Sequence, residues 1–386
     1  MIPEGWNLCT LNEITKEKIS YGIVQAGPHI DGGIPYIKST NVRDEINIHD
    51  LQCTSEEIHY KYRRSAVHPE DIIFSLRGNI GKSAIIPSDI SEANLTQGTA
   101  RISVNTLNNN LFIFYQLSTT PVLNRINSVS KGSTFKEISL TDLRKVNILV
   151  PPLPEQKKIA QILSTWDKAI TITEQLIANS QQQKKALMQQ LLTGQRRLAG
   201  FSGEWRNSQI KDCAICLDNK RIPLNAGKRL EMQGIYPYWG ANGILDYIDN
   251  YIFDETIVLL AEDGGYFNEF SIRPIANISY GKAWVNNHAH ILTAKSNITN
   301  KWLYYSLVHK NILGFVNSGT RAKLNKKDML LIPLLLPPIK EQQKITQILT
   351  SADQEISTLQ QKLTFLKQEK KALMQQLLTG KRRVKV

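Results

Sequence analysis

Several short stretches of the 386-residue chain contain residue types that often carry out chemistry. Ile80-Gly81-Lys82-Ser83 matches the end of a phosphate-binding loop, but Leu76 stands where that motif requires glycine. Glu262 and Asp263 are followed by Gly264-Gly265 rather than by the lysine of a common nuclease motif. The patterns Gly-x-Ser-x-Gly, His-Glu-x-x-His and Asn/Asp-Pro-Pro-Tyr do not occur. The sequence therefore predicts no catalytic site.

Two further groups contain residue types that bind metal ions. Cys213 and Cys216 form a Cys-x-x-Cys pair, but zinc would require a second pair nearby, and the sequence has none at the usual spacing. His288 and His290 are two positions apart in a β-like run, a spacing we interpret as an alternation, one inward and one outward. We interpret both groups as structural, and we expect this chain to bind no metal ion.

The composition indicates a polyanionic partner. Lys and Arg number 47 and Asp and Glu number 34, which gives a net charge of +13 at pH 7. A folded protein this basic most often binds nucleic acid. The sequence has no run of about 20 apolar residues that would predict a membrane span. It also begins without a recognisable signal peptide, so we expect a cytoplasmic protein.

The elements that must position such a partner are organised by an internal repeat. Residues 184–194 and 370–380 both read KKALMQQLLTG, an offset of 186 positions. The same offset relates PPLPEQ, from residue 151, to PPIKEQ, from residue 337. Each copy runs from prolines, which can precede a helix, to a glycine where a C-terminal cap belongs. Nearly forty residues of this kind predict a helix of roughly 55–60 Å.

Apolar residues recur in both copies at spacings of three and four, as in the heptad of a coiled coil. In the second copy this stripe includes Ile345, Leu349, Ile356, Leu363 and Leu377. A single helix would expose the stripe to water. We therefore predict that the two helices pair with each other, antiparallel, as an intramolecular coiled coil. The alternative is that each helix belongs to the core of its own domain.

Each helix is preceded by short β-like runs that Gly and Pro punctuate. Gly5-Trp6 opens the first such segment and Gly203-Glu204-Trp205 the second, although the two segments share little other sequence. The helices should therefore do the same job twice, and the globules a similar job on different targets. We predict an α+β chain with a pseudo-twofold internal repeat and four parts: a globule at 1–150, a helix at 151–197, a globule at 198–336 and a helix at 337–386.

Together these features resemble the specificity subunit of type I restriction–modification systems. The resemblance covers the whole chain and is carried by PPLPEQKKIAQIL, PPIKEQQKITQIL and KKALMQQLLTG, and by the globule segments GIPYIKSTNVRD (33–44), DIIFSLRGNIGKSAIIP (71–87), YPYWGANGILDYID (236–249) and SYGKAWVNNHAH (279–290). It implies two target-recognition domains, each followed by a long helix, with the two helices paired antiparallel.

The resemblance also implies a function and partners. It implies a non-catalytic DNA-binding subunit that recognises a bipartite, gapped target in double-stranded DNA. Two methyltransferase subunits and two restriction subunits are the implied partners, and S-adenosylmethionine, ATP and Mg would be bound by those partners. Two alternatives stay open: the recognition subunit of another DNA-modifying defence system, and a stand-alone bipartite DNA-binding protein. The missing motifs argue against a fused enzyme, and the charge argues against a purely structural adaptor.

Loop side chains of the globules are the expected DNA contacts, with basic ones at phosphates and polar ones at base edges. In the first globule these are Lys38, Ser39, Asn41, Arg43, Arg77, Asn79, Lys82, Gln97, Thr99 and Lys136. In the second globule they are Lys228, Tyr238, Trp239, Asn242, Lys282, Asn286, Asn287, Arg321 and Lys323. Tyr238 and Trp239 could equally belong to the core. The helices would hold the two readers a fixed distance apart along the DNA.

Overall fold

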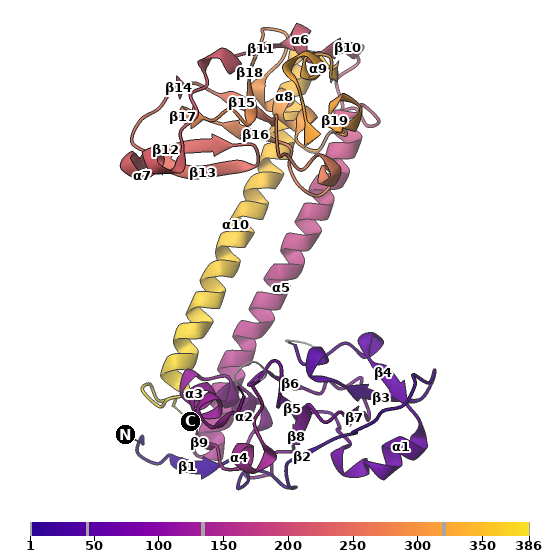
Figure 1. Ribbon diagram of the computed structural model, residues 1–386, viewed down its shortest axis with the longest axis vertical. Helices are drawn as coiled ribbons and strands as arrows, with labels where there is room; N and C mark the ends of the chain where they lie inside the picture. The colour runs from indigo at the N-terminus through magenta and orange to yellow at the C-terminus, as the bar shows by residue number, and fades with distance from the viewer. Residues whose placement is uncertain (1, 44–45, 133–135, 319–321, 386) are drawn as a thin grey trace. The chain divides into compact units, whose positions relative to one another are not determined.

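The computed structural model describes residues 2–43, 46–132, 136–318 and 322–385 (Figure 1). The chain divides into two compact units, of which unit 1 comprises Met1–Glu174 and Gln361–Val386, and unit 2 comprises Gln175–Gln360. Two long helices, α5 (Leu153–Leu192) and α10 (Ile339–Leu377), each contribute residues to both units. The predicted long helices are therefore confirmed, whereas the four-part domain division stays a prediction.

Unit 1 is a mixed α/β globule. Its strands are β1 (Asn7–Thr10), β2 (Ser20–Tyr21), β3 (Ile34–Ile37), β4 (Gln52–Thr54), β5 (Ile72–Ser75), β6 (Ser83–Ile85), β7 (Asn94–Leu95), β8 (Thr99–Ile102) and β9 (Asn147–Val150). Its shorter helices are α1 (Glu56–Lys61), α2 (Asn110–Leu117), α3 (Thr120–Val129) and α4 (Leu140–Arg144). The sheets have the strand orders β2-β8-β5-β6, β4-β3-β7 and β1-β9, and only β3 and β7 pair in parallel among these strands.

Unit 2 has the same class of fold. Its strands are β10 (Arg206–Gln209), β11 (Ala214–Cys216), β12 (Gln233–Gly240), β13 (Gly243–Ile248), β14 (Phe253–Asp254), β15 (Ile257–Ala261), β16 (Ala276–Ser279), β17 (Lys282–Val285), β18 (Ala289–Ala294), β19 (Asn317–Ser318), β20 (Ala322–Lys323) and β21 (Pro333–Leu336). Its shorter helices are α6 (Ile210–Cys213), α7 (Ala226–Glu231), α8 (Asn300–Leu307) and α9 (Lys326–Met329). The sheets have the orders β11-β18-β15-β16, β13-β12-β17-β14, β10-β21 and β19-β20.

The two globules share one frame of strands. In the four-stranded sheets β5 and β15 hold the same place, and each pairs antiparallel with β8 or β18. Each frame also contains one parallel pair, β3 with β7 and β12 with β17. The last strand before each long helix, β9 or β21, pairs antiparallel with β1 or β10. The predicted similarity of layout is thus confirmed despite the divergent sequences.

Each globule builds its main core around the ends of both long helices. In unit 1, Ile159 and Leu163 of α5 and Leu377 of α10 are buried in one cluster with Phe74 and Phe112. Fully burying an aliphatic side chain of this size contributes roughly 1.5–3 kcal/mol. Part of the alternative from the sequence is therefore also correct, because both helices are core elements of the globules.

Unit 2 repeats this arrangement with the opposite helix ends. Met188 and Leu191 of α5 and Ile345 and Leu349 of α10 are buried in one cluster with Trp302. Among the described residues, no helix is apolar enough over a sufficient length to cross a lipid bilayer.

A buried carboxylate joins the globule to the helix ends in unit 1. Glu155, in the first turn of α5, is almost fully buried and accepts a hydrogen bond from Nε1 of Trp6 (3.3 Å). The same carboxylate accepts two hydrogen bonds from Nε and Nη2 of Arg383, at 2.7 and 2.8 Å. Arg383 also donates from Nη1 to the carbonyl oxygen of Glu4 (2.7 Å). The two ends of the chain are therefore held at one carboxylate.

Unit 2 contains the same contact. Glu341 in the first turn of α10 is fully buried and accepts from Nε1 of Trp205 (3.1 Å). It also accepts from Nε and Nη2 of Arg197, at 2.7 and 2.8 Å, and Nη2 of Arg197 donates to the carbonyl oxygen of Gly203 (2.9 Å). A negative charge in the first turn also suits the dipole of each helix. The main role of the two glutamates in the structure is to accept from a tryptophan and an arginine.

The helix starts are held by a second duplicated contact. Oε1 of Gln156 accepts from the backbone N–H of Asn109 (2.8 Å), and Nε2 donates to the carbonyl oxygen of Pro151 (2.8 Å). Oε1 of Gln342 accepts from the backbone N–H of Thr299 (3.0 Å), and its Nε2 donates to the carbonyl oxygen of Pro337 at 2.9 Å. Each glutamine thereby satisfies backbone groups on both sides of the globule–helix junction.

Ion pairs give the direction of the helices within unit 1. Asp167 of α5 pairs with Lys370 of α10, and Glu174 of α5 pairs with Lys367 at 2.7 Å. As residue numbers rise along α5 the partners fall along α10, so the two segments run antiparallel in this unit. Tyr115 donates to Asp167 (2.6 Å), and burial together with this carboxylate raises the pKa of Tyr115.

The equivalent contacts occur within unit 2. Lys184 of α5 pairs with Asp353 of α10 at 2.5 Å, and Tyr305 donates to Asp353 at 2.6 Å. Oγ of Ser180 donates to Glu355 at 3.4 Å, so the segments again run antiparallel. The pairing of the helices as a coiled coil stays a prediction.

Removing one indole N–H should weaken one unit only. Trp6→Phe and Trp205→Phe keep a smaller aromatic ring at each site, which is buried for Trp6 and partly buried for Trp205, and leave Glu155 or Glu341 with one donor fewer. We expect each substitution to lower the free energy of unfolding by about 1 kcal/mol, or the melting temperature by roughly 2–4 °C. Amide hydrogen exchange should show faster exchange in the unit that carries the substitution.

Tyr247→Phe is the matched control, because the Tyr247 side chain is half-exposed on β13. It should leave stability within about 0.5 kcal/mol of the wild type. Equal losses in the control and in the tryptophan variants would contradict the assigned role of the two carboxylates.

Candidate nucleic-acid interface

In unit 1 most of the predicted contact residues follow the inner strands of the frame. Arg77, Asn79 and Lys82 are exposed in the loop between β5 and β6. Oγ of Ser75 donates to the carbonyl oxygen of Arg77 (3.1 Å), which fixes the start of this loop. Gln97 is half-buried in the turn before β8. These side chains therefore lie on short segments anchored directly to the sheet.

Two further predicted residues of unit 1 make contacts within the chain. Nζ of Lys38 donates to Oε1 of Gln52 (2.6 Å) and lies over the ring of Tyr36. Oδ1 of Asn41 accepts from the backbone N–H of Lys38 (3.0 Å) and so holds the short 3-10 turn at Ser39–Asn41. Ser39 is half-buried, and Arg43 and Lys136 are exposed. The structure leaves all of these except Thr99 with some exposed surface.

Thr99 is a predicted DNA contact, but its side chain is not exposed. Its side chain is fully buried, and its hydroxyl lies within hydrogen-bond distance of the carbonyl oxygens of Ile37 (3.3 Å) and Thr96 (3.0 Å). Threonine is common in strands because its branched side chain packs there. We therefore withdraw Thr99 from the interface.

In unit 2 three predicted residues lie on segments that neighbour the end of β15 or the start of β18. Nδ2 of Asn242 donates to the carbonyl oxygen of Gly264 at 2.9 Å, so the turn after β12 is tied to the loop after β15. Nζ of Lys323 lies 3.3 Å from Oε1 of Glu262 at the start of the same loop. Asn287 is exposed in the turn before β18. Arg321 lies outside the described residues.

Three other choices in unit 2 are buried or mostly buried. Tyr238 is 1% exposed, and its hydroxyl accepts from the backbone N–H of Leu224 at 2.9 Å. Asn286 is 5% exposed, and its Oδ1 accepts from the backbone N–H of His288. Trp239 packs against a small core, and its Nε1 donates to Ser279. We withdraw Tyr238 and Asn286 and interpret Trp239 as a core residue.

Lys228 and Lys282 belong to a different part of unit 2. Lys228 is exposed on α7, beside the hairpin formed by β12 and β13. Nζ of Lys282 lies 4.5 Å from the ring centre of Tyr251 and 5.5 Å from that of Tyr236. A hydrogen bond with Tyr251 raises the pKa of Lys282. This ammonium therefore stays charged at physiological pH, and its contact with DNA stays a prediction.

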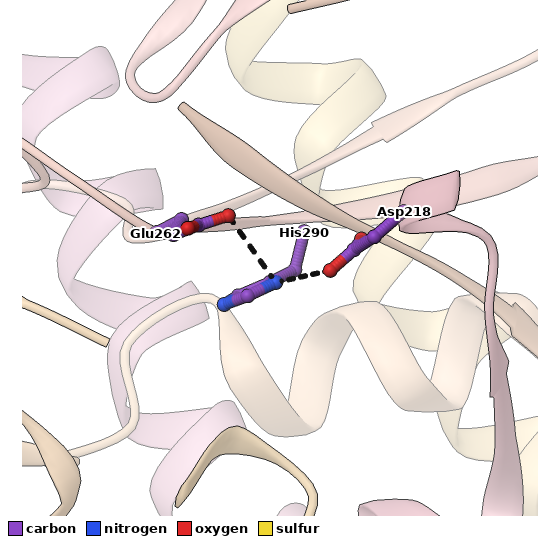
Figure 2. Close-up of side chains that lie close together, drawn as sticks. All are labelled: Asp218, Glu262 and His290. Carbon is purple, nitrogen blue, oxygen red and sulfur yellow. Dashed lines mark hydrogen bonds and ion pairs between the residues drawn. The ribbon is translucent and has the colours of Figure 1, made fainter. Parts of the chain in front are cut away.

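Beneath the loops of unit 2 lies a buried group of charges that sequence reasoning missed. Nδ1 of His290 on β18 lies 2.7 Å from Asp218 and 3.6 Å from Glu262 (Figure 2). The other ring nitrogen, Nε2, lies 2.8 Å from the carbonyl oxygen of Leu324. Both ring nitrogens therefore face acceptors. His290 is buried on β18, whereas His288 lies in the turn before this strand and is partly exposed. The predicted alternation of the two along one strand is therefore wrong, because residues two positions apart on a strand face the same side.

Two basic residues complete this group. Nη1 of Arg221 lies 2.5 Å from Oε2 of Glu262, and Nη2 lies 3.6 Å from Asp218. With Lys323 on the other oxygen of Glu262, both carboxylates are paired with cations. We call these five residues, Asp218, Arg221, Glu262, His290 and Lys323, the charge cluster. One His and two carboxylates this close could hold a metal ion, but Arg221 and Lys323 already supply the opposing charge.

The electrostatics of the charge cluster follow from this pairing. Burial alone would raise the pKa of Asp218, but hydrogen bonds from His290 and from the backbone of Ile291 bring it below its ordinary value. Burial would likewise raise the pKa of Glu262, and the hydrogen bond from Arg221 lowers it. The cluster ties the segments at 218–221, 262, 287–290 and 323–324 together, because Arg221 also donates to the carbonyl oxygens of Asn287 and Ala289.

The Cys213 and Cys216 pair is another group of possible metal ligands in unit 2. Cys213 is buried, Cys216 is half-buried, and burial raises the pKa of both thiols. Sγ of Cys213 donates to Ser208 (3.1 Å). Raised thiol pKa values disfavour the thiolate that metal binding and redox chemistry need. The structural interpretation of this pair stays a prediction.

Comparison with known proteins identifies the family. Residues 3–179 and 202–368 match the family described as the type I restriction modification DNA specificity domain. The chain is 29% identical over 210 residues to the type I restriction enzyme EcoBI specificity subunit of Escherichia coli. This alignment covers 53% of this chain and 44% of that protein. It is 25% identical over 424 aligned residues to the type I restriction enzyme MjaVIII specificity subunit of Methanocaldococcus jannaschii. That alignment covers 100% of this chain and 94% of that protein.

The fold also matches solved structures. The chain resembles the crystal structure of the type I restriction–modification S subunit from M. genitalium with a TM-score of 0.65 and 16% identity, over 98% of this chain and 96% of that one. The fold class is thus a mixed α/β protein with two copies of one frame of strands and two long helices. Because the matched segments span most of its length, the chain belongs to the type I restriction–modification DNA specificity family.

The charge cluster should make unit 2 sensitive to acid. A carboxylate whose folded pKa is lowered contributes stability above its unfolded pKa, and this stability is lost as pH falls through the folded pKa. We therefore expect the stability of unit 2 to fall as pH drops below about 4. Hydrogen exchange of β15 and β18 as a function of pH measures the effect.

Substituting one carboxylate tests the same point at neutral pH. Glu262→Gln should cost about 1–2 kcal/mol, because it removes the anion of Lys323 and the closer of the two carboxylates beside Arg221. It should also make the acid dependence shallower. Glu269→Gln is the matched control, since Glu269 forms an exposed i,i+4 pair with Arg273 and should change stability by less than about 0.5 kcal/mol. An unchanged acid profile in Glu262→Gln would be inconsistent with the assigned pKa directions.

Proposed function

We propose that this chain is the DNA-recognition subunit of a type I restriction–modification complex, and that its two globules read the two halves of a bipartite, gapped target in double-stranded DNA. The observation that supports this best is the duplication itself. Two copies of one frame are attached to the same helix ends by the same glutamate, glutamine and aspartate contacts. Their exposed loops carry different polar side chains, as two readers of different words require.

The net charge of +13 fits this role. Lysine and arginine side chains that neutralise phosphates release condensed counterions, and this release drives much of the binding to DNA. Arg77, Lys82 and Lys136 are exposed in unit 1, and Lys228 and Lys323 are exposed in unit 2. We assign Lys82, Lys136 and Lys228 to phosphates, because compact ammonium groups on flexible stems bind without regard to sequence.

We propose that the chain has no catalytic activity of its own and directs partner subunits to the target. Two methyltransferase subunits would bind directly, and two restriction subunits would bind through them. S-adenosylmethionine, ATP and Mg would be bound by these partners. The two helices repeat their first turns and the segment KKALMQQLLTG, and these repeated ends offer one surface twice, as two copies of one partner require.

The exposed flanks of the helices are the proposed surface for the methyltransferase. In unit 1, Ile172 of α5 and Phe365 of α10 remain more than half exposed, at 55% and 57%. In unit 2, a groove of about 780 Å³ follows α5 and is lined in part by Met188, Leu192 and Phe270. Exposed apolar side chains of this size on a helix favour contact with another protein.

A phosphate contact should act equally on all sequences. We expect Lys82→Ala to weaken binding to specific and non-specific duplexes by a similar factor. The slope of log affinity against log salt should become shallower by about one. Fluorescence anisotropy over a salt series measures both quantities.

The control for this experiment is Lys362→Ala, a substitution on α10 away from the proposed DNA-contacting loops. It should leave the salt slope unchanged. Equal slopes for wild type, Lys82→Ala and the control would contradict the assignment of Lys82 to a phosphate.

Helix length should set the unread gap between the half-words. Inserting about seven residues, two helical turns, into α5 with a matched insertion in α10 lengthens the helices by roughly 10 Å. We expect a gap about three base pairs wider, at about 3.4 Å per base pair, with both half-words unchanged. Sequencing of methylated DNA from cells that express the complex measures the word and its gap. An unchanged gap would exclude the helices as the spacer.

A further inference from the structure

Three segments of unit 1 meet at one exposed edge with fixed backbone geometry. The backbone N–H of Leu76 donates to the carbonyl oxygen of Gly98 (2.9 Å), and the N–H of Ile138 donates to the carbonyl oxygen of Leu76 (3.0 Å). Arg77 and Glu137 form an antiparallel bridge beside these bonds. The residues that follow the buried strand β5 are thus held between two neighbouring segments.

Unit 2 has the same backbone geometry at the same point. The N–H of Glu262 donates to the carbonyl oxygen of His288 (2.9 Å), and the N–H of Leu324 donates to the carbonyl oxygen of Glu262 (2.8 Å). Asp263 and Lys323 form the antiparallel bridge. Both bridge residues follow their unit 1 counterparts by 186 positions (263 − 77 and 323 − 137), which is the offset of the helix repeat.

We call the three matched places the edge positions, and each is occupied by a side chain that can hydrogen-bond to a base. They are Arg77 and Asp263 after the inner strand, Gln97 and Asn287 in the turn before the next strand, and Glu137 and Lys323 across the bridge. Each edge therefore carries one cation, one amide and one carboxylate. The amide keeps its place, whereas the cation and the carboxylate exchange places between the two globules.

The residue beside the bridge also differs between the two units, and it differs in a way that suits the charge at the bridge. A Cβ atom on Gly98 would lie only 3.1 Å from Nε of Arg77, so the absence of a side chain at Gly98 leaves room for the guanidinium group. The equivalent residue in unit 2 is His288, whose Nδ1 lies 3.5 Å from the carboxylate of Asp263. The residue beside each bridge therefore accommodates the charged side chain there: Gly98 leaves space for Arg77, and His288 lies next to Asp263.

The donor and acceptor chemistry of base edges matches these side chains. Arg and Lys donate to guanine, Asn and Gln pair with adenine, and Asp and Glu accept from cytosine. A cation and a carboxylate that exchange places would exchange the bases preferred at those places. A rigid backbone with different side chains is therefore sufficient to make two different half-words.

Resting on the function proposed above, we propose that the edge positions are the base-contacting, specificity-determining residues of each globule. Arg77 selects guanine in one half-word, and Lys323 selects guanine at the exchanged position of the other. Gln97 and Asn287 contact the bases beside them. The lysines assigned above to phosphates contribute affinity without sequence preference.

Selection from a randomised double-stranded DNA library tests this proposal. The full chain, assembled with its methyltransferase partner, is compared with Arg77→Gln, Lys323→Gln and the phosphate-contact control Lys82→Gln. Arg77→Gln should lose about tenfold or more of its preference at one base pair of one half-word, and Lys323→Gln should do so in the other half-word only. Lys82→Gln should lower affinity for every sequence and leave the selected word unchanged.

The outcomes separate this proposal from the proposed function. A wild-type complex that selects no sequence would overturn the proposed function. A wild-type complex that selects a two-part word, with the same word selected by Arg77→Gln and Lys323→Gln, would overturn the edge positions alone. Asn287→Ala, at an exposed residue outside the charge cluster, provides a second test in unit 2. If Lys323→Gln melts well below the wild type, Asn287→Ala decides the result for that unit.

Discussion

The structure depends on two buried carboxylates, Glu155 and Glu341. A carboxylate without partners in a protein interior is strongly unfavourable, so its donors must be present whenever the unit is folded. In unit 1 those donors are Trp6, near the start of the chain, and Arg383, near its end. In unit 2 they are Trp205 and Arg197, which a short segment of chain connects. The same junction is therefore formed once by the two chain termini and once by a continuous segment.

This junction explains why the helix ends have kept the same residues while the globules have diverged. Each helix supplies a glutamate, a glutamine and an aspartate to the globule before it, and the segment that follows each helix supplies the arginine of the other junction. A substitution in a helix thus affects contacts in both units. The globules contribute mainly a tryptophan, a tyrosine and backbone groups, and their outer loops take no part in these contacts. Sequence is free to change at those loops as long as the strands keep their pairing.

Much of the fold followed from local pattern. The long helices, their glycine caps with φ near +70° at Gly194 and Gly380, and the strand before each Pro-Pro pair are as predicted. Periodicity did not reveal that both helices enter both cores, because burial against a distant segment leaves no local signal. The site was harder. Thr99, Tyr238 and Asn286 are polar residues in or next to strands that bond to backbone groups, and the charge cluster joins residues as distant in sequence as Asp218 and His290.

The charge cluster is one example of how the side chains of the two globules have diverged on the same backbone. The backbone position of Leu76, buried and apolar in unit 1, is occupied in unit 2 by Glu262, and the position of Ala100 is occupied by His290. A buried pair of this kind stabilises a fold little compared with apolar packing, but it does fix the orientation of the groups that it joins. Here it fixes Lys323 and the segment that carries Asn287. Unit 1 orients its equivalent loop by a bridge and a glycine, so the two globules reach the same backbone arrangement through different side-chain chemistry.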